Sequence, residues 1–471
     1  FDAIDAASGK FNITNRFYFT NLKKYQIHYS VLANGKTVKS GKVSLDIAPQ
    51  ASKEFTVPVN GLKARPGTEY FVNFSVIAVE PEPLIPAGYE IAYDQFRLPV
   101  EAERNTYKAN GPALQTQTQG DELTVSSSKV NFVFNKKSGL VTSYKVDGTE
   151  YFKDGFGIQP NFWRAPNDND YGNGAPKRLH VWKQSSKDFH VTDTKVSTED
   201  KAVLLQATYL LAAGNLYVVT YKIYPSGIVH VNAKFTSTDM QAAETEVSEA
   251  TRMATFTPGS DAARKAASKL EVPRIGVRFR LPAQMNNVQY FGRGPEENYI
   301  DRNHGTMVGI YQTTADKMYF NYVRPQENGH HTDTRWLNLS PDKGNGLVLV
   351  ADSLIGFNAL RNSVEDFDSE EALPHPYQWN NFSPEEAANH DEKAARNVLR
   401  RMHHVNDVTP RDFVEVCVDM KQQGVGGYDS WGARPEPFHQ IPANREYNWG
   451  FTLVPVRSGS QATEAAKYDY R

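Results

Sequence analysis

Four consecutive residues with oxygen-bearing side chains could bind a cation. Asn167-Asp168-Asn169-Asp170 places two carboxylates and two amides side by side, and Ca²⁺ prefers such oxygen ligands. The same residue types also form Asx turns, in which the side chain hydrogen-bonds to its own backbone. No third carboxylate follows at a defined spacing, so a local turn is the favoured interpretation. Asp168 and Asp170 stay only as candidate metal ligands.

Two histidine pairs, His330-His331 and His403-His404, are a second candidate metal site. Neighbouring residues on a strand point to opposite faces of the sheet, so neither pair can hold one ion unless its loop bends. We therefore interpret these histidines as exposed loop residues. The single cysteine, Cys417, excludes an internal disulfide and a multi-cysteine zinc site, but it does not identify the compartment.

Common catalytic motifs are absent from the sequence. It contains no H-E-x-x-H, no phosphate-binding G-x-x-x-x-G-K and no G-x-G-x-x-G that opens a helix. Gly292-Arg293-Gly294 and Gly424-Val425-Gly426-Gly427 are rich in glycine, but neither precedes a helical pattern, and both are predicted to be turns. The segment 427–432 is similar to a nucleophile elbow, yet Tyr428 stands where that motif needs its first glycine.

Aromatic residues flanked by polar residues are the remaining chemical signal. Sugars bind on aromatic faces through their C–H groups, while neighbouring carboxylates, amides and arginines bind the hydroxyls. For each tryptophan taken singly, burial in a core is the favoured alternative. The segments with this pattern are Asn161–Arg164, Tyr290–Arg293, Arg335-Trp336, Gln378–Asn380 and Asp429–Trp431.

The elements that must position these residues are β-strands. Apolar and polar residues alternate along most of the chain, and turn residues such as Asn34-Gly35 separate the runs. The fold class is therefore predicted to be all-β, with one short helix starting at Ser383-Pro384 and ending near Arg400. The alternating runs include Phe11–Phe19, Gln26–Val31, Tyr70–Val76, Ala202–Tyr209, Leu216–Tyr224, Ile228–Phe235, Gly276–Leu281, Gly346–Ala351, Asp412–Asp419 and Asn448–Val454.

The 471 residues exceed one ordinary domain. Turn spacing predicts a small β-sandwich over 1–103, a polar linker over 104–120, a large β-sandwich over 121–457 and a loose tail over 458–471. The 52 basic and 54 acidic residues nearly balance, which gives no reason to expect nucleic acid or an anionic membrane as partner. No run approaches the ~18 apolar residues of a membrane span.

Four segments resemble, in order, signature motifs of bacterial β-galactosidases that combine a (β/α)₈ barrel with β-sandwich domains. The first segment is similar to N-F-W-R-A-P-T-D-N-D-x-G, with Asn167 in place of the more usual Thr. The others are similar to G-x-G-P-x-E-N-Y-x-D-R, to Y-V-x-P-x-E-N-G with a distal Arg, and to G-x-G-G-x-D-S-W. The four segments are Asn161–Gly174, Tyr290–Arg302, Tyr322–Trp336 and Gly424–Gly432.

This resemblance implies an immunoglobulin-like domain followed by a β-supersandwich similar to galactose mutarotase. It further implies the C-terminal, non-barrel part of an enzyme that hydrolyses terminal β-D-galactose residues of β-galactosides such as lactose. The barrel, its two catalytic Glu residues and most ligands of a divalent cation (Mg²⁺ or Ca²⁺) would lie in the missing N-terminal domains of the same chain. With no catalytic residue of its own, this chain is expected to be inactive alone.

One substrate-binding residue follows from the resemblance. Trp431 matches the family's D-S-W tryptophan, which forms a platform beside the bound sugar, and Asp429 and Gly432 are expected to shape its loop. The glutamates of the motifs, Glu296, Glu297 and Glu327, do not match the family's catalytic pair and are interpreted as partners of turns and arginines.

A second hypothesis is a stand-alone carbohydrate-binding or mutarotase-like β-sandwich. Mutarotation needs a general acid and a general base that face one sugar, and Glu327, His330 and His331 are the candidates.

Overall fold

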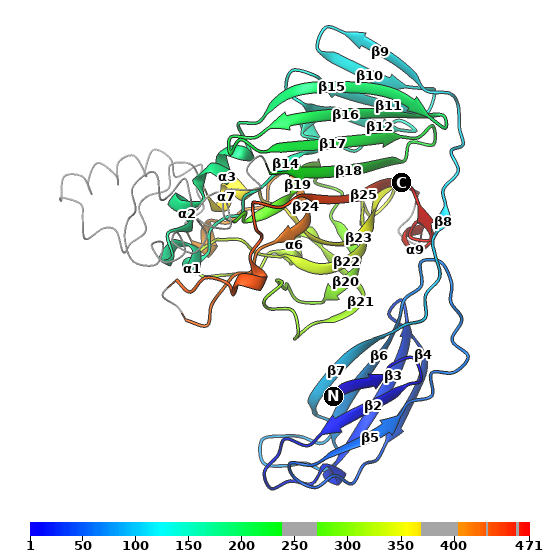
Figure 1. Ribbon diagram of the computed structural model, residues 1–471, viewed down its shortest axis with the longest axis vertical. Coiled ribbons are helices and arrows are strands. Elements are labelled where there is room, and N and C mark those ends of the chain that lie inside the picture. The colour runs from blue at the N-terminus through cyan, green and yellow to red at the C-terminus, as the bar shows by residue number, and fades with distance from the viewer. Residues whose placement is uncertain (238–270, 369–403, 430–431, 458–460) are drawn as a thin grey trace, which may run out of the picture. The chain divides into compact units, whose positions relative to one another are not determined.

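The computed structural model describes residues 1–237, 271–368, 404–429, 432–457 and 461–471. Strands form most of the regular secondary structure in this part of the chain, and its helices are short (Figure 1). The chain forms two compact units. The first unit comprises Phe1–Tyr107, Met307–Tyr311 and Thr463–Tyr470, and the second comprises Lys108–Thr306, Gln312–Ala462 and Arg471.

The first unit contains a small antiparallel β-sandwich. One sheet has three strands in the order β1-β2-β5, and the other has four in the order β4-β3-β6-β7. Alternate residues of the strands point into one core, where the rings of Phe11 and Phe74 meet at 5.0 Å. The strands are β1 Asp2–Asp5, β2 Lys10–Thr14, β3 Tyr25–Ala33, β4 Lys36–Val43, β5 Ser52–Thr56, β6 Tyr70–Ala78 and β7 Glu90–Leu98.

Turn chemistry fixes one hairpin of this sandwich. Asn34 and Gly35 connect β3 to β4 with φ of 46° and 75°, values that a two-residue hairpin turn requires and that Asn and Gly tolerate best. The Asn34 amide donates to the carbonyl of Gly67 and its oxygen accepts from the backbone of Glu69, both at 2.8 Å. The predicted turn is confirmed.

Two sheets build the second unit. A five-stranded sheet has the order β13-β12-β11-β10-β9, and the large sheet has the path β14-β19-β24-β23-β25-β18-β17-β16-β15 with β20, β21 and β22 branching from it. Aromatic side chains fill its core, as in the contact of Phe132 with Tyr221 at 5.6 Å between ring centroids. Figure 1 shows β15 to β18 as neighbouring strands.

The bounds of these strands match the predicted alternating runs to within three residues at β16 to β19, β24 and β25, while β23 continues past the predicted end at Ala351 to Leu360. They are β9 Gln115–Gln119, β10 Glu122–Ser126, β11 Val130–Asn135, β12 Leu140–Val146, β13 Thr149–Glu150, β14 Gln159–Asn161, β15 His190–Glu199, β16 Ala202–Leu210, β17 Leu216–Ile223, β18 Val229–Thr236, β19 Arg274–Pro282, β20 Asn287–Gly294, β21 Met307–Thr314, β22 His331–Ser340, β23 Gly346–Leu360, β24 Phe413–Gln422 and β25 Tyr447–Val456. The all-β prediction is confirmed.

Helical segments are single turns or little more. They are η1 Leu22–Lys24, η2 Lys153–Gly155, α1 Asp168–Gly172, α2 Ala175–Arg178, α3 His180–Ser185, α6 Ala315–Met318, α7 Val364–Phe367, η4 Val405–Asp407, η5 Pro437–His439 and α9 Ala462–Ala465. None of the described helices is long and apolar enough to cross a membrane. The helix predicted from Ser383 to Arg400 lies outside the described residues.

Three local predictions differ from the structure. The predicted linker contains β9, which pairs with β10 through main-chain hydrogen bonds that its polar side chains do not prevent. The predicted tail contains β26 Tyr468–Asp469, which pairs in parallel with β8 Asn105–Thr106. Gly292 and Gly294 lie within β20 rather than in a turn. The glycine at position 292 is required by close packing, because a Cβ there would lie 2.5 Å from the hydroxyl of Thr334.

Candidate functional site

A buried arginine joins the first motif to the fourth. The Arg164 guanidinium donates to both carboxylate oxygens of Asp170, at 3.1 and 3.0 Å. It also donates to the carbonyl oxygens of Gln423 and Gly424, at 2.7 and 3.0 Å. Bidentate pairs of this kind fix orientation as well as supplying energy. The glycine-rich segment that follows β24 is therefore anchored to the start of α1.

The Asn167–Asp170 cluster caps a helix. The Asn167 side chain accepts from the backbone of Asp170 at 2.8 Å, and the Asp170 carboxylate accepts from the backbone of Asn167 at 3.1 Å. The Asn167 amide donates further to the carbonyl of Val425 at 3.2 Å. Asp168 pairs with Arg324 at 2.8 Å. The local hydrogen bonding predicted for this cluster is confirmed.

These carboxylates do not fit a cation site. Asp170 and Asp168 each bind an arginine, which takes the place that a metal ion would need. Within the described residues, no group of three or more His, Cys, Asp or Glu side chains is arranged to hold a metal ion.

Asp301 holds the other side of the glycine-rich segment. Its carboxylate accepts from the backbone nitrogens of Val425 at 3.0 Å and Gly426 at 2.9 Å. A side chain at position 424 would lie 2.3 Å from this carboxylate, so the close approach requires Gly424. We call residues 424–429 together with 432 and 433 the glycine loop.

The glycine loop is fixed on both sides of the predicted platform. The Asp429 carboxylate accepts from the backbone of Ala433 at 3.0 Å. Gly432 has φ of 116°, and a Cβ there would lie 2.4 Å from the carbonyl carbon of Gly172 in α1. Trp431 itself lies outside the described residues. The structure thus describes Asp429 and Gly432 on either side of the segment 430–431, and the role of Trp431 stays a prediction.

A second buried arginine joins the third motif to the sheet. Arg274 is fully buried and donates to Glu327 at 3.2 Å and to the carbonyl of Trp163 at 3.3 Å. Its Nε also lies 3.1 Å from the Asp419 carboxylate, in an ion pair without hydrogen-bond alignment. Burial raises the pKa of Asp419 to about 7, although Arg274 opposes the shift. Burial likewise raises the pKa of Glu327.

The histidines of the third motif belong to this interior. His330 stacks on Tyr299 at 5.4 Å and lies 3.7 Å from Asp419, and burial lowers its pKa well below the ordinary value. Burial lowers the pKa of His331 to about 4, while Nδ1 of its ring lies 3.0 Å from the carbonyl oxygen of Arg293. Both imidazoles are therefore neutral at pH 7.

The prediction of exposed loop histidines is wrong for this pair. His330 and His331 are buried because aromatic rings and β22 enclose them, a tertiary effect that strand alternation does not reveal. His404 is exposed, as predicted, and His403 lies outside the described residues.

The motif glutamates bind turns and arginines, as predicted for Glu297 and Glu327. Glu297 accepts from Arg302 at 2.6 Å and from the backbone of Gly329 at 2.7 Å. Glu327 accepts from Arg274. Glu296 is exposed, and its backbone carbonyl accepts from an asparagine amide at 3.1 Å.

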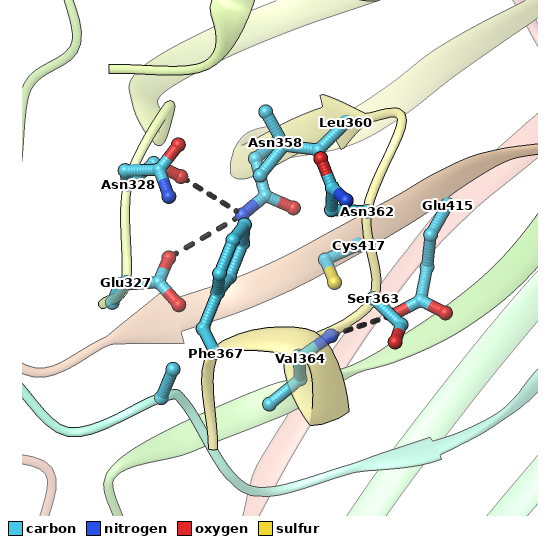
Figure 2. A pocket seen from close by; sticks show the side chains of 11 residues that line it. Glu327, Asn328, Asn358, Leu360, Asn362, Ser363, Val364, Phe367, Glu415 and Cys417 are labelled. Carbon is cyan, nitrogen blue, oxygen red and sulfur yellow. Dashed lines mark hydrogen bonds between the residues drawn. The ribbon is translucent and has the colours of Figure 1, made fainter. Parts of the chain in front are cut away.

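A small cavity with both polar and apolar lining residues lies beside Glu327 (Figure 2). Asn358 and Glu327 both line it, and the Asn358 amide donates to the Glu327 carboxylate at 3.3 Å, a bond that Figure 2 shows. Its volume of about 10 Å³ holds roughly one water molecule, so it is far too small for a sugar ring. The lining residues are Ala165, Glu327, Asn328, Asn358, Leu360, Asn362, Ser363, Val364, Phe367, Glu415 and Cys417.

Two of the candidate sugar-binding tryptophans are core residues. Trp163 and Trp336 are buried, and the Trp163 indole donates to Asp368 at 2.6 Å. The packing interpretation is confirmed for both. Trp379 lies outside the described residues. Sequence reasoning missed Arg274 and Asp419, although a charged residue inside an apolar strand such as Arg274-Ile275-Gly276-Val277 is a signal for a buried ion pair.

Comparison with known proteins agrees with the four motifs. The family described as beta galactosidase small chain matches residues 126–453, and the one described as beta-galactosidase, domain 4, matches residues 11–99. The β-galactosidase of Priestia megaterium is 31% identical over 96% of this chain and 38% of that protein. The β-galactosidase of Streptococcus thermophilus is 25% identical over 94% of this chain and 37% of that protein.

Solved structures are more distant. A galactose mutarotase related enzyme from Lactobacillus acidophilus has a TM-score of 0.34 and 10% identity, over 71% of this chain and 97% of that one. A galactose 1-epimerase from the same species has a TM-score of 0.33 and 7% identity, over 74% and 99%. The chain spans well under half the length of the curated relatives it matches. By its family matches and its relatives, the chain belongs to the β-galactosidase small-chain family.

Proposed function

We propose that this chain is the C-terminal, non-barrel part of a β-galactosidase that hydrolyses terminal β-D-galactose residues. In this proposal it supports the catalytic barrel and places Trp431 beside the bound sugar. The observation that carries it is the glycine loop of a β-galactosidase small-chain member. Asp301 of the second motif binds the backbone of this loop before position 431, and Asp429 binds the backbone of Ala433 beyond it. A divalent cation of the enzyme would be bound outside this chain.

The carboxylates of this chain are poorly suited to glycoside hydrolysis. A retaining enzyme needs two carboxyls roughly 5–5.5 Å apart that face the sugar. Glu297, Glu327, Glu415 and Asp419 each pair with an arginine, and the last three are buried. We therefore expect the purified 471-residue chain to leave a chromogenic β-galactoside intact, while the whole polypeptide hydrolyses it. Turnover by the 471-residue chain would overturn the proposal.

The alternative of a stand-alone sugar-binding or mutarotase-like protein has no comparable support. Its candidate acid and base residues, Glu327, His330 and His331, are buried and engaged with neighbouring groups. Calorimetry with galactose and lactose separates the two hypotheses. We expect no sub-millimolar binding to this chain alone, and such binding would favour the alternative.

Replacing Trp431 by Ala in the whole polypeptide should raise KM for a β-galactoside about tenfold, because an aromatic platform for the sugar is lost. The measurement is steady-state kinetics with a chromogenic substrate. Phe438→Ala is the control, because Phe438 is also an aromatic residue and is 71% exposed on η5. An unchanged KM in the Trp431 variant would remove this residue from the site.

A further inference from the structure

Three aromatic residues lie exposed at one end of the small β-sandwich. Phe17, Tyr18 and Phe19 follow β2, and Tyr18 and Phe19 are 75% and 97% exposed. They were predicted to continue a strand, but β2 ends at Thr14. Exposed large side chains gathered in this way are a feature of interaction sites, because a soluble surface rarely leaves several together in water.

Two further apolar residues lie at the same end. Tyr25 begins β3 and pairs with Ala78, which ends β6, so the loop after β6 starts where β3 starts. Val79 and Leu84 in that loop are exposed. Tyr25 links the two loops, because the Phe17 ring stacks on its ring at 5.7 Å and its hydroxyl donates to Glu82 of the loop after β6 at 3.1 Å. We call Phe17, Tyr18, Phe19, Val79 and Leu84 the aromatic end.

A buried asparagine fixes the aromatic loop. The Asn15 amide donates to the carbonyls of Thr20 at 2.9 Å and Ile47 at 3.0 Å, and its oxygen accepts from the backbone of Phe17 at 3.0 Å. These bonds turn the chain away from β2 and explain why the strand stops. The alternation over 11–19 therefore predicted the strand's start but not its end.

A glutamine holds the same loop from the other side. The Gln50 amide donates to the carbonyls of Arg16 and Phe17, each at 3.0 Å. The loop backbone is thus held in one conformation while its aromatic side chains point into solvent. A preorganised aromatic surface loses little conformational entropy on binding, and aromatic residues are enriched among the residues that dominate interfaces.

We propose that the aromatic end is an interface with the part of the same β-galactosidase polypeptide that lies outside these 471 residues. This inference rests on the proposed function. The occupant follows from length, because the relatives continue for more than half of their residues beyond the matched part. A partner segment of matching chemistry presents an apolar surface that covers Phe19.

Photocrosslinking in the whole polypeptide tests this interface. Phe19 is replaced by p-benzoylphenylalanine, and the crosslinked peptides are identified by mass spectrometry. The control position is Val38, which is exposed on β4 of the same sandwich. We expect crosslinks from position 19 to residues of the same polypeptide outside this chain. We expect no such crosslinks from position 38.

Other results would overturn the inference. These are no crosslink from position 19, a crosslink inside residues 1–471, or a crosslink to a second copy of the polypeptide. As a second measurement, Phe19→Ser should lower the midpoint of thermal unfolding of the whole polypeptide, whereas Val38→Ser should leave it unchanged. A polypeptide that hydrolyses β-galactosides without the expected crosslink would contradict this interface alone. A polypeptide that fails to hydrolyse them would contradict the proposed function, whatever position 19 contacts.

Discussion

Replacing Arg274 by Met should lower the free energy of unfolding of the second unit by about 3–5 kcal/mol, because removing one partner of a buried ion pair leaves the others uncompensated. The guanidinium is fully buried and lies between Glu327 and Asp419. Methionine fills similar space but supplies no charge. Two carboxyl groups would then share an apolar interior with no cation between them.

The deficit of the Arg274→Met variant should depend on pH. With Arg274 present, burial already raises the pKa of Asp419 to about 7 from 3.8, and it raises that of Glu327 as well. A carboxyl whose folded pKa is raised contributes stability at low pH that is lost as the pH rises through that pKa. Without the arginine both pKa values rise further, so the deficit should be larger near about pH 8 than near about pH 5.

Tryptophan fluorescence in urea can follow this unit alone. All six tryptophans of the chain fall within the sequence of the second unit. Lys129→Met is the matched control, because Lys129 belongs to the same unit and its pair with Asp147 lies at the surface. Its loss should cost no more than about 1 kcal/mol. If the two variants unfold at the same urea concentration, the buried network does not stabilise the fold as described.

Adding Glu327→Gln and Asp419→Asn to the Arg274 variant gives a further check. Neutral amides of similar shape remove the uncompensated charges, so part of the lost stability should return and the pH dependence should weaken. A triple variant that is less stable than Arg274→Met at high pH would contradict the electrostatic explanation.

Local alternation predicted the strands well because it records which face of each strand is buried. Residues 216–224 show this, since β17 covers Leu216–Ile223 and its burial alternates strictly from Tyr217 to Ile223. Alternation carries no information on partners, however. Ala233 of β18 pairs with Trp449 of β25, more than two hundred residues away, and only the folded sheet brings them together.

The sequence predicted which residues belong to the candidate site, but not which contacts hold them in place. Asp301 was visible only as part of a motif, and its two bonds to the glycine loop depend on how distant segments meet. His330 and His331 are buried, although the sequence predicted exposed histidines. The residues next to a histidine in the sequence do not show whether the folded chain encloses it. A charged residue inside an apolar strand, such as Arg274, indicates a buried ion pair, and this signal is visible in the sequence.

Replacing Gly432 by Ala should reduce kcat/KM of the whole polypeptide for a β-galactoside by about 10²-fold, because displacing a positioning element by ~1 Å can cost that much. The added Cβ would lie 2.4 Å from the carbonyl carbon of Gly172 and 2.6 Å from the backbone nitrogen of Asn173. Backbone atoms of α1 cannot move aside as a flexible side chain would. The glycine loop must therefore shift, and Trp431 with it.

A matched glycine separates this displacement from simple backbone strain. Gly344 has φ of 113°, close to the 116° of Gly432, but the nearest atom to its added Cβ is 3.7 Å away. Both alanine variants carry the same penalty for a positive φ, and only the Gly432 variant carries the collision. We therefore expect Gly344→Ala to lose some thermal stability while keeping its kinetics. Equal kcat/KM values in the two variants would mean that the glycine loop does not position the sugar. A loss of kcat/KM in Gly432→Ala but not in Gly344→Ala, which Trp431→Ala reproduces, would place the loop and the tryptophan in one functional unit.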